Sequence, residues 1–515
     1  MKKVGNSVFN KKVSKSGTFF NYVFEKAVFS AIVVLVLIFI LWPVGEVIKE
    51  SFFPEGAFSF KLYKDLIQNN KQLIYNSIFV GVLTTVFSTI LSLCIAVYAS
   101  FSGSRMKKIL TLVLMVTMIS PPFVSSLAYI SLFGRRGFIT YRLLKLSWNP
   151  YGWLGIVLMQ TISNVSINSL LLIGIIQGID KSLLMASQDL GSSPSYAVRK
   201  ILLPSMVPGI IVTALLTFIR SLSDFGTPMV IGGSFNVLAT EVYLNIIAHS
   251  NMALASAMSV LILVPALIAF FVYRFYMKKS ALALAGNNKV TSSENEFALK
   301  GFLKSSLAMI TAFYAAVMLL QYLSIFISSF SKYVRGNMSF TLENYIKLKD
   351  YSLDSFIRSI VYSLIAGVLG SILGMMISYF NERRSIRGMK TVDFIATLPY
   401  ILPGTFFGIG YILAFNGPIL PLTGTAAIVV LNCVFKQMPM TTKVSSAVIS
   451  QINGDIEDAA RDLGAKNIQI IKDIIIPNLK RAFVVGFVNN FTATMTTVGA
   501  IIFLVYPGQK VATLE

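Results

Sequence analysis

Long apolar runs recur along this chain and limit the folds it can adopt. Eleven runs of about 20 residues are each long enough to cross the hydrocarbon core of a membrane as a helix. Only 13% of the 515 residues are charged and 55% are hydrophobic, whereas a soluble protein has about 25% charged residues. We therefore expect an all-α polytopic membrane protein, with spans near 27–48, 74–99, 109–133, 152–176, 206–232, 252–276, 306–328, 357–380, 392–415, 424–446 and 480–505.

The net charge of +22 does not indicate nucleic-acid binding, because the basic residues lie in short loops between apolar runs. This is the positive-inside pattern, which places such loops and the basic N-terminus in the cytoplasm. The run at 27–48 is too long for a signal-peptide core, so it is expected to be retained as a span. One loop departs from the rule, since Arg135, Arg136, Arg142 and Lys145 fall on the outside by this count.

Two polar segments interrupt the apolar pattern. We call residues 180–204 the first elbow and residues 455–477 the second elbow. The positions of Gly191 and Gly464 differ by 273, and those of Pro204 and Pro477 differ by the same interval. A fixed interval of this kind indicates a duplicated unit.

Each elbow is predicted to be a helix, a stop and a second helix. Asp455 is expected to cap a helix beginning at Ile456, with acidic residues in its first turn. Gly464 suits the left-handed residue that ends such a helix. In the first elbow, Ser193 is expected to cap a second helix whose first residue is Pro194.

The order of spans and elbows predicts two parallel repeats that each return to the cytoplasmic side. We expect a first repeat at 1–278, a cytoplasmic linker at 279–303 and a second repeat at 304–515. The same interval of 273 pairs Gly226 with Gly499, after which only the short segment 500–515 remains. A twelfth span is therefore expected to be missing at the C-terminus, through a truncated reading frame, a fragment or a genuine eleven-span chain.

No constellation for catalysis is present in the sequence. There is no Gly-x4-Gly-Lys-Ser/Thr phosphate loop, and the single His249 cannot form a metal site by itself. Cys94 and Cys433 both lie in apolar runs, as expected of buried thiols rather than metal ligands. The chain is expected to be no enzyme, and two polar elbows with small residues on their apolar stripe favour docking to a partner protein over an ordinary amphipathic loop.

The second elbow resembles the Glu-Ala-Ala-x3-Gly loop of binding-protein-dependent ABC importer permeases, which have the type I importer fold. Asp458 stands at the position of the motif's Glu, whereas the first elbow has Met185 there and only Asp189 nearby. The resemblance implies that both elbows contact an ATPase subunit dimer, which binds ATP and Mg, while this chain binds no cofactor. The implied contact residues are Met185, Ala186, Ser187, Asp189, Leu190, Gly191, Pro204, Asp458, Ala459, Ala460, Asp462, Leu463, Gly464 and Pro477.

The proline-broken run 398–411 and the segment 223–228 are similar to those of fused double permeases of the ferric iron and 2-aminoethylphosphonate branch. This resemblance implies a bacterial inner-membrane protein that receives its solute from an extracytoplasmic solute-binding protein. Membrane lipid is then its other partner, and no nucleic acid is expected. Permeases for polyamine, thiamine or another small solute remain alternatives, as do an ion-coupled secondary transporter and a membrane scaffold without transport.

Polar residues inside the spans are candidates for the translocation path, because such residues are costly in lipid and face a pore or a neighbouring helix. Arg220 and Asp224 are one helical turn apart in sequence and are expected to be able to pair. Interhelical hydrogen bonding is the alternative role for every candidate. The cations Arg220 and Lys436 favour an anionic cargo whereas Asp224 suits a metal ion, so the charges leave both kinds of cargo open. The candidates are Tyr129, Arg220, Asp224, Tyr411, Asn432, Lys436, Asn490, Thr494 and Thr497.

Overall fold

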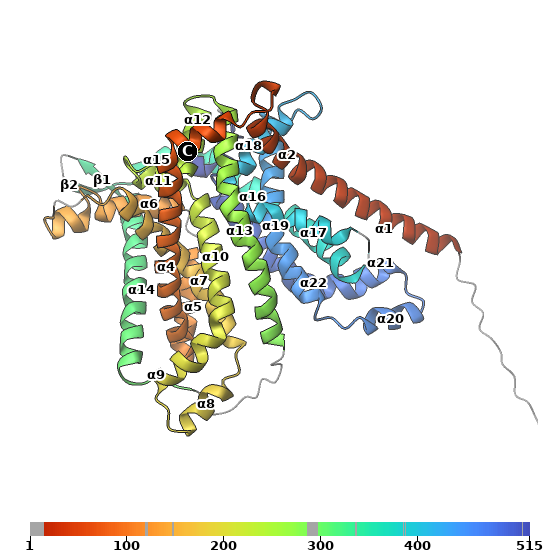
Figure 1. Ribbon diagram of the computed structural model, residues 1–515, viewed down its shortest axis with the longest axis horizontal. Helices are drawn as coiled ribbons and strands as arrows, with labels where there is room; N and C mark the ends of the chain where they lie inside the picture. Colours follow the sequence, from red (N-terminus) through yellow and green to blue (C-terminus); the bar gives the residue numbers. More distant parts are fainter. Residues whose placement is uncertain are drawn as a thin grey trace, which may run out of the picture. The chain divides into compact units, whose positions relative to one another are not determined.

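The computed structural model describes residues 15–118, 122–146, 149–285, 297–334, 337–384, 386, 388–506 and 508–514. Within these ranges the chain is almost entirely helical, which confirms the all-α prediction (Figure 1). A small antiparallel hairpin of β1 (Ser331–Val334) and β2 (Asn337–Phe340) is the exception among the described residues. Pro121, the basic residues before Lys15 and most of the predicted linker lie outside them.

The first repeat contains helices of very different lengths. Their bounds are α1 (Lys15–Val36), η1 (Leu37–Leu41), α2 (Trp42–Phe52), η2 (Pro54–Gly56), α3 (Lys61–Asn69), α4 (Lys71–Ser100), α5 (Ser104–Met118), α6 (Pro122–Phe133), η3 (Phe138–Leu143), α7 (Trp153–Gln177), α8 (Ser182–Asp189), α9 (Pro194–Ala197), η4 (Val198–Leu202), α10 (Leu203–Ser223), α11 (Gly226–Ile231), α12 (Leu238–Ile247) and α13 (Met252–Ala285).

The second repeat follows a similar order. Its helices are α14 (Gly301–Ser329), α15 (Glu343–Lys347), η5 (Leu348–Ser352), α16 (Leu353–Arg383), α17 (Met389–Ile401), α18 (Gly404–Phe415), α19 (Ala426–Ile449), α20 (Asp455–Asp462), α21 (Asn467–Ile470), η6 (Ile471–Ile475), α22 (Ile476–Thr496) and η7 (Ala512–Leu514).

Seven stretches of described helix are long and apolar enough to cross a membrane, or up to eight if the broken pair α17–α18 counts as one span. The chain is thus a multi-pass membrane protein, although the predicted count of eleven is not reproduced by this measure. Proline explains part of the difference. The run at 392–415 is interrupted at Leu402 and Pro403, because proline lacks the N–H that would continue the helix. The run at 109–133 contains residues 119–121, which lie outside the described ranges.

The elbow of each repeat and the helix that follows it carry the duplication. Helices α8, α9, η4 and α10 have the same bounds as α20, α21, η6 and α22 once 273 is added to each residue number. Gly191 and Gly464 both have positive φ, +85° and +88°. The interval inferred from two glycines and two prolines therefore holds for four consecutive elements.

Packing divides the chain differently from sequence duplication. One compact unit contains residues up to Trp42, then 362–400 and 433–494, and a second contains 43–361, 401–432 and 495–515. These units do not coincide with the repeats at 1–278 and 304–515. In the first unit the N-terminal helical run packs on second-repeat helices, since the rings of Phe29 and Phe380 have centroids 5.8 Å apart.

The second unit contains the converse arrangement. Helix α14, the first span of the second repeat, packs on α4 and α6 of the first repeat. Tyr314 shares a 2.6 Å hydrogen bond with Ser166, and the Ser324 hydroxyl donates to Ser131 at 3.2 Å. The first span of each repeat is therefore bound to helices of the other repeat.

Candidate functional site

The first elbow begins with a side chain that fixes its first turn. Oδ1 of Asp180 accepts a 2.9 Å hydrogen bond from the backbone N–H of Ser182. The side chain of Ser182, together with this N–H, holds the pKa of the Asp180 carboxyl below its ordinary value. As predicted, the Ser193 hydroxyl caps α9 by accepting from the N–H of Tyr196 at 3.2 Å, and Pro194 is the first helical residue. Gly191 makes the turn between the two helices with its positive φ.

In the second elbow the predicted cap is wrong. Helix α20 begins at Asp455 and its N-cap residue is Gly454, which provides no side-chain cap, while Oδ1 of Asn453 accepts the N–H of Asp455 at 3.1 Å. Asn453 is the equivalent of Asp180 at the repeat interval, so the two side chains perform the same task. Gly464 ends this segment in the left-handed conformation, as predicted.

The two elbows expose a leucine at the same place. Leu190 is 89% exposed and Leu463 is 90% exposed, and each directly precedes the glycine of its turn. Asp458, like most other contact candidates, is exposed, whereas Met185 is half-buried. Exposed large apolar residues rimmed by polar ones are typical of protein contact sites.

The first elbow is attached to its repeat by apolar packing. Leu184, only 1% exposed, belongs to a buried cluster that also contains Ala197 and Val198. Phe297 and Leu299, at the described end of the predicted linker, join the same cluster. The Phe297 ring also contacts Phe101 just after α4, with centroids 5.0 Å apart, so the linker end helps to hold the elbow.

The second elbow is attached by charge. Glu457, which is 3% exposed, occupies the position equivalent to Leu184 and forms an ion pair with Arg383 at 2.9 Å. Arg383 also donates to the backbone carbonyls of Ile449, the last residue of α19, and of Ile452 just after it. This role of Glu457 is not among the sequence-based predictions, although an acidic residue on the buried stripe of a short amphipathic helix was the available signal.

The predicted pair between Arg220 and Asp224 is not formed. Helix α10 ends at Ser223, and Asp224 has extended backbone torsions, so the two side chains are not one helical turn apart. Asp224 instead accepts hydrogen bonds from the side chain of Gln160 at 3.1 Å and from the N–H of Thr227 at 3.1 Å. This carboxylate thus joins α7 to the start of α11 in the second unit.

Asn490 lies in a triad of hydrogen-bonding side chains in the first unit. Its amide donates to Thr441 at 3.0 Å and to Ser371 at 3.3 Å, and the residue is fully buried. The second unit has a corresponding group, in which Asn168 donates to Thr217 at 2.7 Å and to Ser88 at 2.9 Å. Each triad joins three helices.

Lys436 extends to a broken helix. Its ammonium donates to the Pro399 carbonyl at 2.6 Å. That carbonyl would normally accept from the residue four positions later, which is Pro403 and has no N–H. Lys436 therefore supplies the hydrogen bond that proline removes.

The remaining path candidates differ in their hydrogen bonding. Tyr129 donates to the Pro150 carbonyl at 3.3 Å and Tyr411 to the Leu431 carbonyl at 3.5 Å. Thr494 is buried, and the Thr497 carbonyl accepts from the hydroxyl of Thr513 at 3.0 Å. Asn432 is fully buried, and neither polar atom of its amide has a hydrogen-bond partner among the described residues.

Comparison with known families agrees with this geometry. The family described as "Binding-protein-dependent transport system inner membrane component" matches residues 90–280 and 366–514, one match in each repeat and each containing an elbow. The chain belongs to this family. It is a permease component of a binding-protein-dependent ABC importer, with both permease repeats fused in one chain, and such components are not enzymes.

Two ferric transport permeases match this permease over nearly all of its length. Ferric transport system permease protein FbpB of Actinobacillus pleuropneumoniae is 29% identical over 94% of this chain and 72% of that protein. Putative ferric transport system permease protein FbpB 1 of Haemophilus influenzae is 28% identical over 93% of this chain and 78% of that protein. Sulfate transport system permease protein CysT of Salmonella typhimurium is 22% identical over only 28% of this chain. The resemblance to fused double permeases of the iron branch is confirmed.

Proposed function

We propose that this permease carries ferric iron from an extracytoplasmic solute-binding protein into the cytoplasm by alternating access. The proposal is supported by relatives that are ferric transport permeases and cover more than nine-tenths of the chain. Relatives named for sulfate and for spermidine and putrescine match only about a third of it or less. A 2-aminoethylphosphonate-like anion is the second candidate cargo. Among the path candidates, Asn432 is best suited to contact ferric iron or this anion, because its amide is fully buried and has no hydrogen-bond partner among the described residues.

The observation that carries the mechanism is the pair of elbows with equal element bounds and equally exposed leucines. A separate ATPase dimer, binding ATP and Mg, would receive one elbow in each subunit. Closing of that dimer would move both elbows together and open the path outward, where the loaded binding protein delivers its solute. Because only differential binding can shift such an equilibrium, ATP and the loaded binding protein are the two ligands that drive it. The N-terminus and both elbows then lie on the cytoplasmic side.

The coupling role is tested by Gly464→Arg. Gly464 has φ of +88° and no atom within 4 Å of the position that a Cβ would take, so arginine fits in space but strains the turn and projects from the elbow. We expect loss of ATPase co-purification and of ferric iron uptake. Gly388→Arg is the matched control, because Gly388 has φ of +91° and is equally open but lies outside both elbows. Unchanged ATPase capture by the Gly464 variant would exclude the coupling role.

The cargo is tested by uptake of radioactive ferric iron in cells that express the permease with its ATPase and binding protein. Excess 2-aminoethylphosphonate should leave iron uptake unchanged. Competition by the phosphonate, or uptake that depends on an ion gradient and persists without ATP, would contradict ferric iron import by an ABC mechanism. Asn432→Ala should lower the uptake rate while leaving ATPase capture intact.

A further inference from the structure

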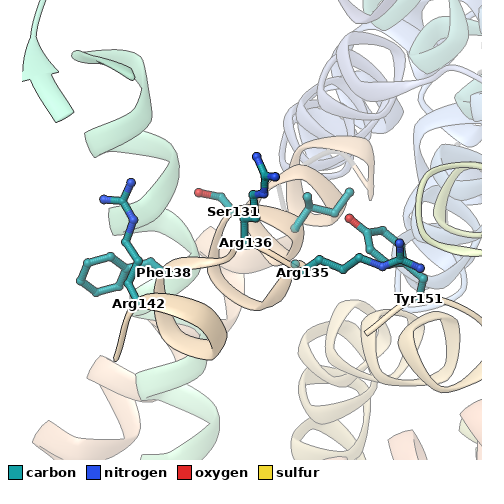
Figure 2. A pocket seen from close by; sticks show the side chains of 8 residues that line it. Ser131, Arg135, Arg136, Phe138, Arg142 and Tyr151 are labelled. Atoms are coloured by element: carbon teal, nitrogen blue, oxygen red, sulfur yellow. The ribbon is translucent and has the colours of Figure 1, made fainter. Parts of the chain in front are cut away.

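A basic cavity is lined by residues of α6 and η3. Helix α6 lies toward the end of the second unit opposite to α8 and α9 (Figure 1). The cavity has a volume of about 600 Å³ and is lined by Arg135, Arg136 and Arg142 together with the hydroxyls of Ser131 and Tyr151. Arg135 extends over the Tyr151 ring, 5.9 Å from its centroid, while Arg136 and Arg142 project from other parts of the rim (Figure 2). The cavity is large enough for a small organic ligand rather than a bare ion.

The lining of this cavity carries an excess of positive charge. No Asp or Glu occurs in the sequence between Asp65 and Asp180, and none is among the residues that line the cavity. Guanidinium groups match the geometry of phosphate oxygens and can bind them through two parallel hydrogen bonds. The lining therefore favours an anion with phosphate-type oxygens.

The surface next to the cavity is apolar. Tyr141, Leu143, Leu144 and Leu146 are all exposed and follow the cavity residue Phe138, which is itself exposed. A short segment that mixes exposed apolar side chains with basic ones is typical of the membrane–water interface. The cavity is thus a polar recess bordered by a surface suited to acyl chains.

The position of the charge supports the same ligand. The first elbow is proposed to be cytoplasmic, so the basic residues at the opposite end of the second unit depart from the positive-inside pattern. Tyr151 and Trp153, at the start of α7, are residue types enriched at membrane interfaces. Basic pockets between membrane helices bind phospholipid head groups on the cytoplasmic side, and the same guanidinium–phosphate chemistry is available to a lipid of the other leaflet.

We propose that the cavity lined by Arg135, Arg136 and Arg142 binds the phosphate of an anionic phospholipid, with its acyl chains along the exposed segment Phe138–Leu146. The lipid belongs to the leaflet on the side opposite the first elbow. Its bound head group neutralises the arginines and anchors α6 and η3 at the membrane surface. The proposal concerns neither the cargo nor the ATPase, so it stands or falls separately from ferric iron transport.

The test uses the purified full-length permease, delipidated in neutral detergent and titrated with phosphatidylglycerol, with bound lipid counted by native mass spectrometry. The triple variant Arg135→Gln, Arg136→Gln and Arg142→Gln should bind about 100-fold more weakly, roughly fivefold for each guanidinium removed. The control variant Lys61→Gln, Lys64→Gln and Lys71→Gln removes the same charge from α3 and α4 without touching the cavity and should bind as wild type. Equal losses in both variants would overturn the proposal.

Further competition experiments distinguish a phospholipid from a free phosphate compound as the ligand of the cavity. Diacylglycerol, which lacks the phosphate, and sn-glycerol 3-phosphate, which lacks the chains, should each fail to displace phosphatidylglycerol. Displacement by glycerol phosphate or inorganic phosphate at equal concentration would overturn the lipid proposal in favour of a free anion. Unchanged lipid binding by the triple glutamine variant, with loss of solute-binding-protein capture, would overturn it in favour of a protein contact. Should the glutamine variant misfold, replacing the three arginines by lysine should give intermediate affinity, and wild-type affinity there would contradict the need for guanidinium groups.

Discussion

The two buried triads contain the same three residue types, with asparagine and threonine in exchanged positions. Asn168 and Thr441 are equivalent at the interval of 273, and so are Thr217 and Asn490. The asparagine therefore lies on α7 in the first repeat and on α22 in the second. The threonine that accepts its hydrogen bond lies on α10 in the first repeat and on α19 in the second. The interaction between the helices has been kept although the residues have changed places.

This exchange predicts that a double substitution repairs a single one. Asn168→Thr should destabilise the permease by about 0.5–2 kcal/mol, because Ser88 and Thr217 lose their donor inside the membrane. Adding Thr217→Asn should restore most of the loss, which thermal unfolding in detergent would measure. Equal unfolding midpoints for the single and double variants would show that the triad does not contribute as a unit.

Lys436 gives a second prediction at a single residue. Lys436→Met should destabilise the protein by about 1–3 kcal/mol, because the buried Pro399 carbonyl then loses its donor. Pro403→Ala in the same background restores an N–H four residues after that carbonyl and should recover part of the stability. Thermal unfolding of the three variants provides the comparison. If Pro403→Ala makes the Lys436→Met variant less stable still, the helix-end role of Lys436 is wrong.

At the scale of elements, the two elbows share their backbone but not their attachment. Leu184 fixes the first through a buried apolar cluster, whereas Glu457 fixes the second through Arg383. Removing one partner of a buried ion pair lowers stability much more than replacing both partners with apolar residues, because the partner that remains is a buried, unpaired charge.

Glu457→Gln should therefore loosen α20 by about 3 kcal/mol, while Arg383→Leu with Glu457→Leu should recover much of the loss. Hydrogen exchange of the α20 amides measures the local opening. Arg461→Gln is a control, because Arg461 is about a third exposed and its contacts are worth at most about 1 kcal/mol. Unchanged exchange in the Glu457 variant would refute the ionic attachment.

Sequence patterns predicted the elbows well because their signals are local. Gly191, Gly464 and Ser193 each act within a few residues, and the structure has them as expected. The pairing of Glu457 could not be predicted, since Arg383 lies on a different helix, α16, far from α20 in the sequence. The Arg220–Asp224 pair failed for a local reason, namely that helix α10 ends one residue before the aspartate.

At the scale of the whole molecule, the exposed leucines Leu190 and Leu463 test whether the two elbows bind the ATPase equally. Leu190→Ser and Leu463→Ser should each weaken ATPase association by about 10- to 100-fold, because burying a leucine contributes about 1.5–3 kcal/mol. The double variant should lose association while its thermal stability stays the same, since both side chains are almost fully exposed. Ile419→Ser, at an 82% exposed site outside the elbows, is the control.

Co-purification of the ATPase with each variant supplies the measurement. A loss confined to one leucine would mean that the two elbows bind unequally, as the absence of an acidic residue at Met185 suggests. Wild-type association in the double variant would exclude the leucines from the contact.

The membrane class, the repeat interval and the family were all predictable from sequence, because apolar length and motif spacing are properties of the chain itself. The compact units were not. Which helix packs on which depends on complementary surfaces far apart in sequence, such as α14 with α4 and α6. The apolar run at 392–415 likewise predicted the place of a span without showing that its helix stops at Ile401 and starts again at Gly404.

The packing of the N-terminal helix with the second repeat has a consequence for biogenesis. Val36 and Tyr362, where its packing partners begin, are 326 positions apart. At about 5–20 residues per second, a ribosome needs roughly 15–65 s to reach those partners. Throughout that interval the first helix can contact only lipid and insertion factors, because its packing partners have not been synthesised. Likewise α4 and α6 are synthesised long before α14, the helix that packs on them. Cutting the gene at the linker would therefore give two polypeptides that can mature only when synthesised together.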